Sequence, residues 1–118
     1  MDFKLSTEQQ MVRDLCRNFT KNEIIPIAEE LDKTGSFPYE VWKKMGNLGI
    51  CGIPFPEECG GWGLDWVSMI IAIEEISRGD ASLGASLLAT VTLPMNLIYI
   101  FGTEDQKQKF LVPLGILK

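Results

Sequence analysis

The chain has 118 residues and a mass of 13.2 kDa, which is the size of one compact domain. Hydrophobic residues make up 46% and charged residues 23%, so a disordered or collagen-like chain is excluded. Eleven Lys and Arg against sixteen Asp and Glu give a formal net charge of -5, which disfavours nucleic acid and anionic membrane surfaces as partners.

The first predicted helix runs from about Thr7 to Asp32. Ser6 followed by Gln9 is a capping-box pattern, and apolar residues recur after it at helical spacing. Pro26 lies inside this helix, and a proline ring clashes with the carbonyl one turn earlier. We therefore expect a kink or a break near residues 22–23.

A second, short helix is predicted from about Pro38 to Gly49. The segment that follows, residues 50–64, holds four glycines and two prolines, which is typical of an irregular connection. Asp65 is placed to cap a third helix that has only a narrow polar strip, so we expect neighbours to enclose it almost completely.

A fourth helix is predicted from Asp80, as its cap, through about Thr92. Pro94 should restart the chain as a shorter helix that ends at Gly102. After it, Thr103 begins another capping-box pattern and opens a last helix, which Pro113 should close.

No convincing alternation typical of a strand appears, so the predicted fold class is all-α: a bundle-like domain of five or six helices spanning residues 1–118. Residues 81–102 carry no charge and are long enough to cross a bilayer. Their hydroxyl side chains, the interruption at Pro94 and the lack of a cationic flank favour buried helices and no membrane span.

Candidate catalytic groups are scarce. The chain has no His, and its three cysteines, Cys16, Cys51 and Cys59, form no Cys-x-x-Cys pair, so we predict packed, reduced thiols and no metal site.

The carboxylates of Glu74 and Glu75 suit acid-base chemistry, but their spacing to Arg78 is that of an ordinary ion pair. The run Gly60–Gly63 lacks the flanking pattern of a phosphate loop, which favours a structural turn.

The fourth helix carries a row of small residues. Ala81, Ala85 and Ala89 are four residues apart, and Ser82, Ser86 and Thr90 lie beside them, so one side of the helix has almost no bulk. Either a closely packed helix backbone or an apolar ligand must fill that space.

Ordered motifs along the whole chain resemble the N-terminal helical domain of the acyl-CoA dehydrogenases. They include Leu5-Ser6-x-Glu8-Gln9, Ile25-Pro26-Ile27-Ala28, Phe37-Pro38, Trp42-Lys43-Lys44-Met45-Gly46, Gly49-Ile50-Cys51-Gly52-Ile53-Pro54, Pro56-Glu57-Glu58-Cys59-Gly60-Gly61, Glu74-Glu75-Ile76-Ser77-Arg78-Gly79-Asp80-Ala81-Ser82 and Phe101-Gly102-Thr103-Glu104-Asp105-Gln106-Lys107. Residues 114–118 depart from the small, polar turn expected before the next domain.

The resemblance implies a flavoenzyme that oxidises acyl-CoA to enoyl-CoA, with FAD held mainly by a middle β domain and a C-terminal helical domain and the catalytic carboxylate in the C-terminal domain. This chain would contain no catalytic residue and retain no FAD. By the motif across Gly102, the residues facing the acyl chain would be Ala85, Ser86, Ala89 and Leu93. Since two of these are alanines, we expect an open pocket floor and a preference for medium or longer acyl chains.

The resemblance also implies partners and a location. Electrons would pass to an electron-transfer flavoprotein, the full-length enzyme would be a homo-oligomer, and it would be cytoplasmic, or in the mitochondrial matrix of a eukaryote. The isolated fragment should self-associate through apolar surface that other domains normally cover. Two alternatives stay open: a domain of an acyl-CoA oxidase, and a stand-alone helical module that binds an acyl chain or a protein.

Overall fold

Five continuous helices make up the part of the chain that a computed structural model describes, residues 1–116. The α-helical segments are α1 (Thr7–Phe19), α2 (Ile25–Thr34), α3 (Tyr39–Asn47), α4 (Trp66–Gly79), α5 (Ala81–Thr90), α6 (Asn96–Phe101), α7 (Glu104–Gln106) and α8 (Val112–Ile116). Two 3-10 turns, η2 (Ile50–Gly52) and η3 (Glu57–Cys59), lie in the connection before α4. The described residues hold no strand, so the all-α prediction is confirmed.

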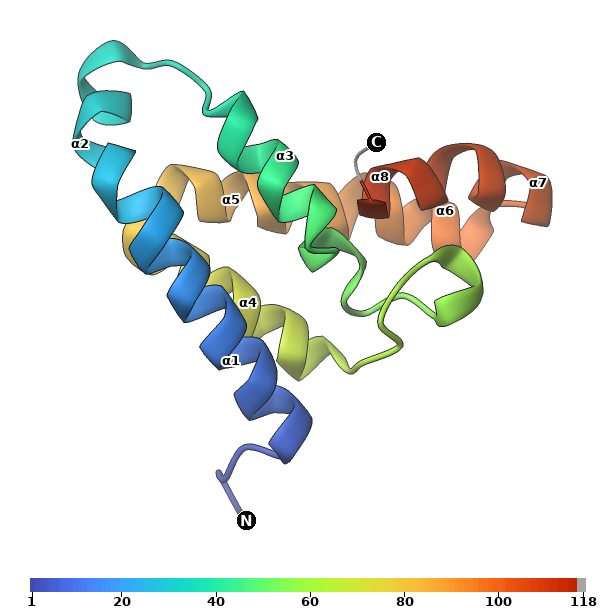
Figure 1. The fold of residues 1–118 in the computed structure, drawn as a ribbon. Helices are drawn as coiled ribbons and strands as arrows, with labels where there is room; N and C mark the ends of the chain where they lie inside the picture. The colour runs from blue at the N-terminus through green and yellow to red at the C-terminus, as the bar shows by residue number, and fades with distance from the viewer. Residues whose placement is uncertain (117–118) are drawn as a thin grey trace.

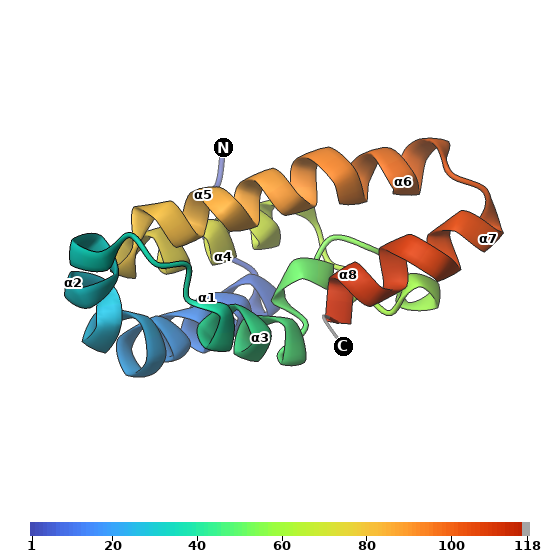
Figure 2. The same ribbon diagram turned by 90° about the horizontal axis from the view of Figure 1, so that it is seen from above.

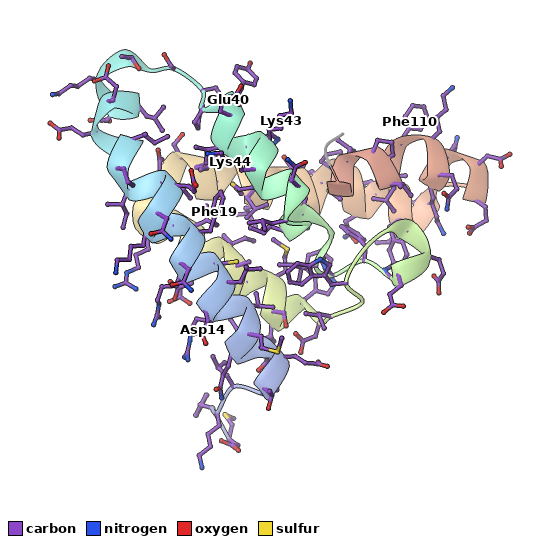
Figure 3. All side chains as sticks on the ribbon, in the orientation of Figure 1. Asp14, Phe19, Glu40, Lys43, Lys44 and Phe110 are labelled. Atoms are coloured by element: carbon purple, nitrogen blue, oxygen red, sulfur yellow. The ribbon has the colours of Figure 1, made fainter. Side chains whose placement is uncertain are left out.

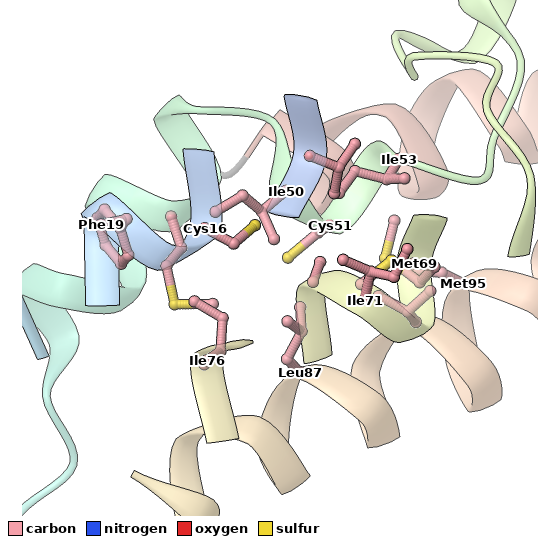
Figure 4. Packing of buried hydrophobic residues seen from close by; sticks show 14 of the residues in the cluster. Cys16, Phe19, Ile50, Cys51, Ile53, Met69, Ile71, Ile76, Leu87 and Met95 are labelled. Atoms are coloured by element: carbon pink, nitrogen blue, oxygen red, sulfur yellow. The ribbon is translucent and has the colours of Figure 1, made fainter. Parts of the chain in front are cut away.

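α4 lies at the centre of the fold, with α1 packed on one side and α5 on the other (Figure 1). Seen from above, α5 and α6 run as one long helix along one side, opposite α1, α3 and α8 (Figure 2). The molecule is correspondingly flat, with extents of 42 × 38 × 20 Å. Apolar side chains from both sides meet in one core, where Cys16, Ile76 and Leu87 come together (Figure 4).

Side-chain caps fix where the helices begin, as the sequence predicts. Ser6 and Gln9 form the complete capping box of α1, with Gln9 donating its backbone N–H to the Ser6 hydroxyl at 3.1 Å. The second predicted box, at Thr103, is also complete. The Asp65 carboxylate accepts from the Ser68 backbone N–H at 2.8 Å, and the hydrogen bonds from Ser68 hold the pKa of Asp65 below its ordinary value.

Three π turns join α-helical segments where the sequence predicted breaks: η1 (Thr20–Ile24), η4 (Val91–Met95) and η5 (Lys107–Leu111). Each has a proline in it or two residues after it, since Pro94 lies in η4, Pro26 follows η1 and Pro113 follows η5. A π turn is wider than an α turn, so it takes up the missing N–H and the ring of a proline without ending the helix.

The predicted separate helix after Pro94 is therefore wrong, because Ala81–Phe101 is one helix of 21 residues. The predicted stop at Pro113 is also wrong, since α8 runs through it to Ile116. The break expected in the first helix is replaced by η1 at the predicted place. Residues 117–118, part of the departure noted at 114–118, lie outside the described residues.

The expected enclosure of the third helix is also wrong. α4 buries Met69, Ala72 and Ile76 completely, yet Val67 and Ile70 on its other side are each 53% exposed. The helix α4 therefore has two apolar sides. One packs in the core of this domain, and no described part of the chain covers the other.

Candidate functional site

The predicted site residues lie in one row on the outer side of the long helix Ala81–Phe101. Ala85, Ala89 and Leu93 are all exposed, at successive steps of four residues, and Ser86 beside them is half-buried. Leu93 is 59% exposed although it is fully apolar. No described part of the chain covers this row.

The row continues further than the sequence analysis placed it. Leu97 and Phe101 follow at the same spacing and are 53% and 79% exposed. The prediction, taken from the motif across Gly102, ended at Leu93.

The helix has a different neighbour on the side of Gly84. There α5 packs so closely on α4 that a Cβ at Gly84 would overlap the Ser77 side chain. Gly84 thus serves close helix packing, whereas the alanines serve an open surface. Close packing therefore explains the small residue on the side of Gly84, and the side of the alanines is left open.

The hydroxyl groups beside the row are used within the helix. Ser86 donates to the carbonyl of Ser82 at 3.1 Å, Thr90 to that of Ser86 at 2.8 Å, and Thr92 to that of Leu88 at 2.7 Å. Since each hydroxyl proton already has an acceptor, the surface offers mainly methyl and methylene groups. Such a surface suits a hydrocarbon.

An apolar groove of about 330 Å³ lies at the C-terminal end of the same helix. Leu97, Ile98 and Phe101 form one side of it, and Gln106 and Phe110 the other. Phe110 projects outward here, on the segment that follows α7 (Figure 3). The exposed row therefore leads into a hollow with apolar walls.

Glu75 is a structural residue. Its carboxylate is buried, and the Arg17 guanidinium of α1 holds it with distances of 2.9 Å from Nη2 to Oε1 and 3.3 Å from Nε to Oε2. These hydrogen bonds raise the pKa of Arg17 above its ordinary value. The predicted partner, Arg78, is further away at 3.7 Å, and Glu74 is exposed. Sequence spacing could not reveal Arg17, which lies 58 residues from Glu75.

The backbone N–H groups of the glycine run all donate to carbonyls in the same connection. Gly60 donates to Glu57, Gly61 to Pro56, Trp62 to the carbonyl of Gly52 and Gly63 to that of Phe55, all between 2.8 and 3.1 Å. An anion-binding loop needs backbone N–H groups that point outward without a partner. The preferred interpretation of the run as a structural turn therefore fits the geometry.

The cysteines are buried and none is in a disulfide. Burial raises the pKa of Cys16, beside Glu75, and of Cys51 to about 12, and it raises that of Cys59 as well. The thiols are thus protonated at neutral pH and are not nucleophiles. Among residues 1–116, no group of three carboxylate or thiol side chains could hold a metal ion.

The helix Ala81–Phe101 is long and apolar enough to cross a membrane by length and composition alone. Its inner side, however, belongs to the core of this domain, since Leu83, Leu87, Val91 and Met95 are each at most 2% exposed. A helix buried in a protein core passes the same test of length and composition, so this result is weak evidence for a membrane span.

Comparison with known proteins identifies relatives along nearly the whole chain. The family "Acyl-CoA dehydrogenase, N-terminal domain" matches residues 6–115. A probable acyl-CoA dehydrogenase of Bacillus subtilis and a short-chain specific acyl-CoA dehydrogenase of Clostridium acetobutylicum are each 52% identical, over 98% of this chain and 30% of the relative.

Solved structures agree with this result. The butyryl-CoA dehydrogenase of Megasphaera elsdenii superposes with a TM-score of 0.93 at 41% identity, over 98% of this chain and 31% of that one. A structure reported for the electron transferring flavoprotein of Acidaminococcus fermentans gives a TM-score of 0.96 at 46% identity, over 98% of this chain and 30% of that one. The chain therefore spans about 30% of the length of the relatives it matches.

Proposed function

Because the chain belongs to the acyl-CoA dehydrogenase family, as its N-terminal helical domain, we propose that it works within an FAD-dependent enzyme that oxidises acyl-CoA to enoyl-CoA. The proposal is supported at the level of residues by one observation: Ala85, Ala89 and Leu93, with Ser86 beside them, form a row that no described part of the chain covers. These residues form one wall of the pocket for the acyl chain.

The wall acts by binding and by exclusion of water. Each methylene group of an acyl chain that leaves water for an apolar surface stabilises the complex by about 0.8 kcal/mol. The alanines leave room for the chain to lie along the helix, and Leu93 adds contact area beyond them. The wall supplies no proton acceptor, since the hydroxyls near it are engaged with backbone carbonyls.

The residues of this chain do not fit a flavin site of their own. The amides of the glycine run are engaged within their loop, and the guanidinium of Arg17 is paired with buried Glu75. Glu75 is likewise committed to that pair and is not a catalytic base. FAD and the base are therefore assigned to the part of the enzyme outside this chain, and the 118-residue chain alone should be inactive.

The acyl-chain preference has two opposing indications. Small residues at Ala85 and Ala89 leave this wall open, which favours a medium or longer chain, whereas relatives from Clostridium acetobutylicum and rat are described as short-chain specific. We infer that this wall itself does not limit chain length. Any short-chain limit then comes from the opposite side of the pocket, outside this chain.

The electron acceptor is inferred to be an electron-transfer flavoprotein, a class of protein named for one structural neighbour. We also propose a homo-oligomer that is cytoplasmic or, in a eukaryote, in the mitochondrial matrix; the rat relative is described as mitochondrial. An acyl-CoA oxidase would instead pass its electrons to oxygen.

Anaerobic assay of the FAD-loaded enzyme that contains this domain tests the function. We expect acyl-CoA to bleach the flavin absorbance and to reduce an added electron-transfer flavoprotein, with little hydrogen peroxide formed in air. Rapid peroxide formation would support the oxidase. Absence of any flavin reduction, with acyl-CoA still bound, would support a binding module and contradict the proposed enzyme.

A further inference from the structure

The long helix keeps two rows of residues in line over a distance at which an α-helix would twist them apart. Residues four apart in an α-helix advance by about 40° around its axis at each step. From Ala85 to Phe101 there are four such steps, which would turn the row by about 160°. Yet Ala85 and Phe101, at the two ends, are both exposed.

The inner row behaves in the same way. Leu83, Leu87, Val91 and Met95 are 2%, 0%, 0% and 0% exposed. Three α-helical steps from the first of these residues to the last would turn the row by about 120°, enough to carry one end out of the core. Both rows therefore need a correction of phase between their two halves.

The π turn η4 (Val91–Met95) supplies that correction. The backbone N–H of Asn96 is shared between the carbonyls of Leu93 and Val91, and the bond to Val91 spans five residues in place of the usual four. A π turn takes up one extra residue and so sets the phase back by about 100°. This shift keeps Met95 in the core and brings Leu97 and Phe101 of α6 closer to the line of Ala85 and Ala89.

Pro94 fixes the place of this turn. It has no N–H to donate to Thr90 and its ring would clash with that carbonyl in an α-helix, so the helix cannot close into regular α geometry here. Pro94 itself is exposed and contributes no core packing. Its effect on the outer row is therefore separable from an effect on the core.

We propose that Pro94 is a positioning residue, which pins η4 and thereby holds the two halves of the acyl-facing row, Ala85–Ala89 and Leu93–Leu97, in a single line. This inference rests on the proposed function of that row. Without the proline, the extra residue of the π turn is free to move along the helix, and the register of Leu93 against the alanines is no longer fixed.

Pro94→Ala tests the inference, and Pro26→Ala is its matched control. Pro26 follows another π turn, η1, is likewise exposed, and lies on α2, at the opposite end of the molecule from α6 (Figure 2). By hydrogen exchange of the 118-residue chain, we expect Pro94→Ala to speed exchange of the amides of residues 91–97 by about tenfold or more. Pro26→Ala should leave those amides unchanged.

The second readout is the ratio of kcat/KM for octanoyl-CoA to that for butyryl-CoA in the FAD-loaded enzyme. We expect Pro94→Ala to change this ratio by about tenfold, as for other small misplacements of a binding wall, and Pro26→Ala to leave it unchanged. An unchanged ratio or unchanged exchange in Pro94→Ala overturns the positioning role. Failure of the unmodified enzyme to oxidise any acyl-CoA would overturn the proposed function instead.

If Pro94→Ala does not fold, Thr92→Val gives a second test, because it removes only the hydroxyl that bonds to the Leu88 carbonyl and keeps the proline. With η4 still pinned, both the exchange rates and the substrate ratio should stay near those of the unmodified protein. A tenfold change of the ratio in Thr92→Val, with unchanged exchange of residues 91–97, would show that the ratio does not depend on the pinned turn, and would overturn the proposal.

Discussion

Glu75 carries a carboxylate that is buried between α1 and α4 and paired with the half-exposed side chain of Arg17. Removing its charge leaves Arg17 without a partner at that contact, while the shape of the side chain stays the same. We expect Glu75→Gln to lower the free energy of unfolding by about 1 to 3 kcal/mol, less than for a fully buried pair because Arg17 reaches solvent.

Urea denaturation of the 118-residue chain measures this change, and Glu74→Gln, at the exposed neighbour, is the control with little expected effect. In the FAD-loaded enzyme, Glu75→Gln should retain turnover. A loss of turnover by several orders of magnitude in a stably folded variant would show that Glu75 is a catalytic group after all.

Asp65 links stability to pH. Hydrogen bonds from Ser68 lower its pKa below the ordinary value of 3.8, so the folded state favours the ionised form. Its contribution is therefore present above pH 3.8 and is lost as the pH falls through the lowered value. Asp65→Asn should reduce the loss of stability between pH 5 and pH 3, measured by urea denaturation. An equal loss in both proteins would contradict this linkage.

At the scale of helices, the contact between α4 and α5 depends on the absence of a side chain at Gly84. A Cβ there would overlap Ser77, so Gly84→Ala must push the two helices apart. We expect a loss of about 1 to 3 kcal/mol in the free energy of unfolding, in spite of the higher helix propensity of Ala. The control Ala85→Ser, on the open side, should change it by at most about 0.5 kcal/mol.

Local signals in the sequence were sufficient for the helix starts. A cap needs only residues within one turn, and Ser6, Asp65, Asp80 and Thr103 all act as predicted. Pro94 and Pro113 were interpreted wrongly, because whether a proline ends a helix or widens one turn depends on packing. At Pro94 the core holds the first and last residues of the turn, Val91 and Met95, so the helix continues.

The site was predictable in part for the same reason. Spacing showed that Ala85 and Ala89 share a side, but only packing shows that this side is open while that of Gly84 is filled. The ion pair of Glu75 with Arg17 joins two helices far apart in the sequence, so no local pattern could indicate it.

The domain leaves large apolar side chains exposed on two of its helices. Trp66, Val67 and Ile70 on α4 and Leu93 and Leu97 on the long helix are 42% to 59% exposed. Large uncovered apolar surfaces mark interfaces. We expect the isolated 118-residue chain to self-associate as its concentration rises, as measured by light scattering after size exclusion.

Ile70→Glu should weaken this self-association, and Gln10→Glu, which adds the same charge at an exposed position on α1, should not. A chain that stays monomeric at high concentration would contradict the prediction. A fragment that retains a yellow colour after purification with added FAD would likewise contradict the assignment of the flavin to the rest of the enzyme.

The proposed acyl-chain wall is tested most directly at Ala89, by the acyl-chain profile of the FAD-loaded enzyme. Ala89→Phe places a ring where the acyl chain should lie, so kcat/KM should fall more for long acyl-CoA than for short, by about tenfold or more between octanoyl-CoA and butyryl-CoA. Leu88→Phe, about 100° around the helix, should leave that ratio unchanged. Equal ratios in Ala89→Phe and the unmodified enzyme would contradict the claim that this row contacts the acyl chain.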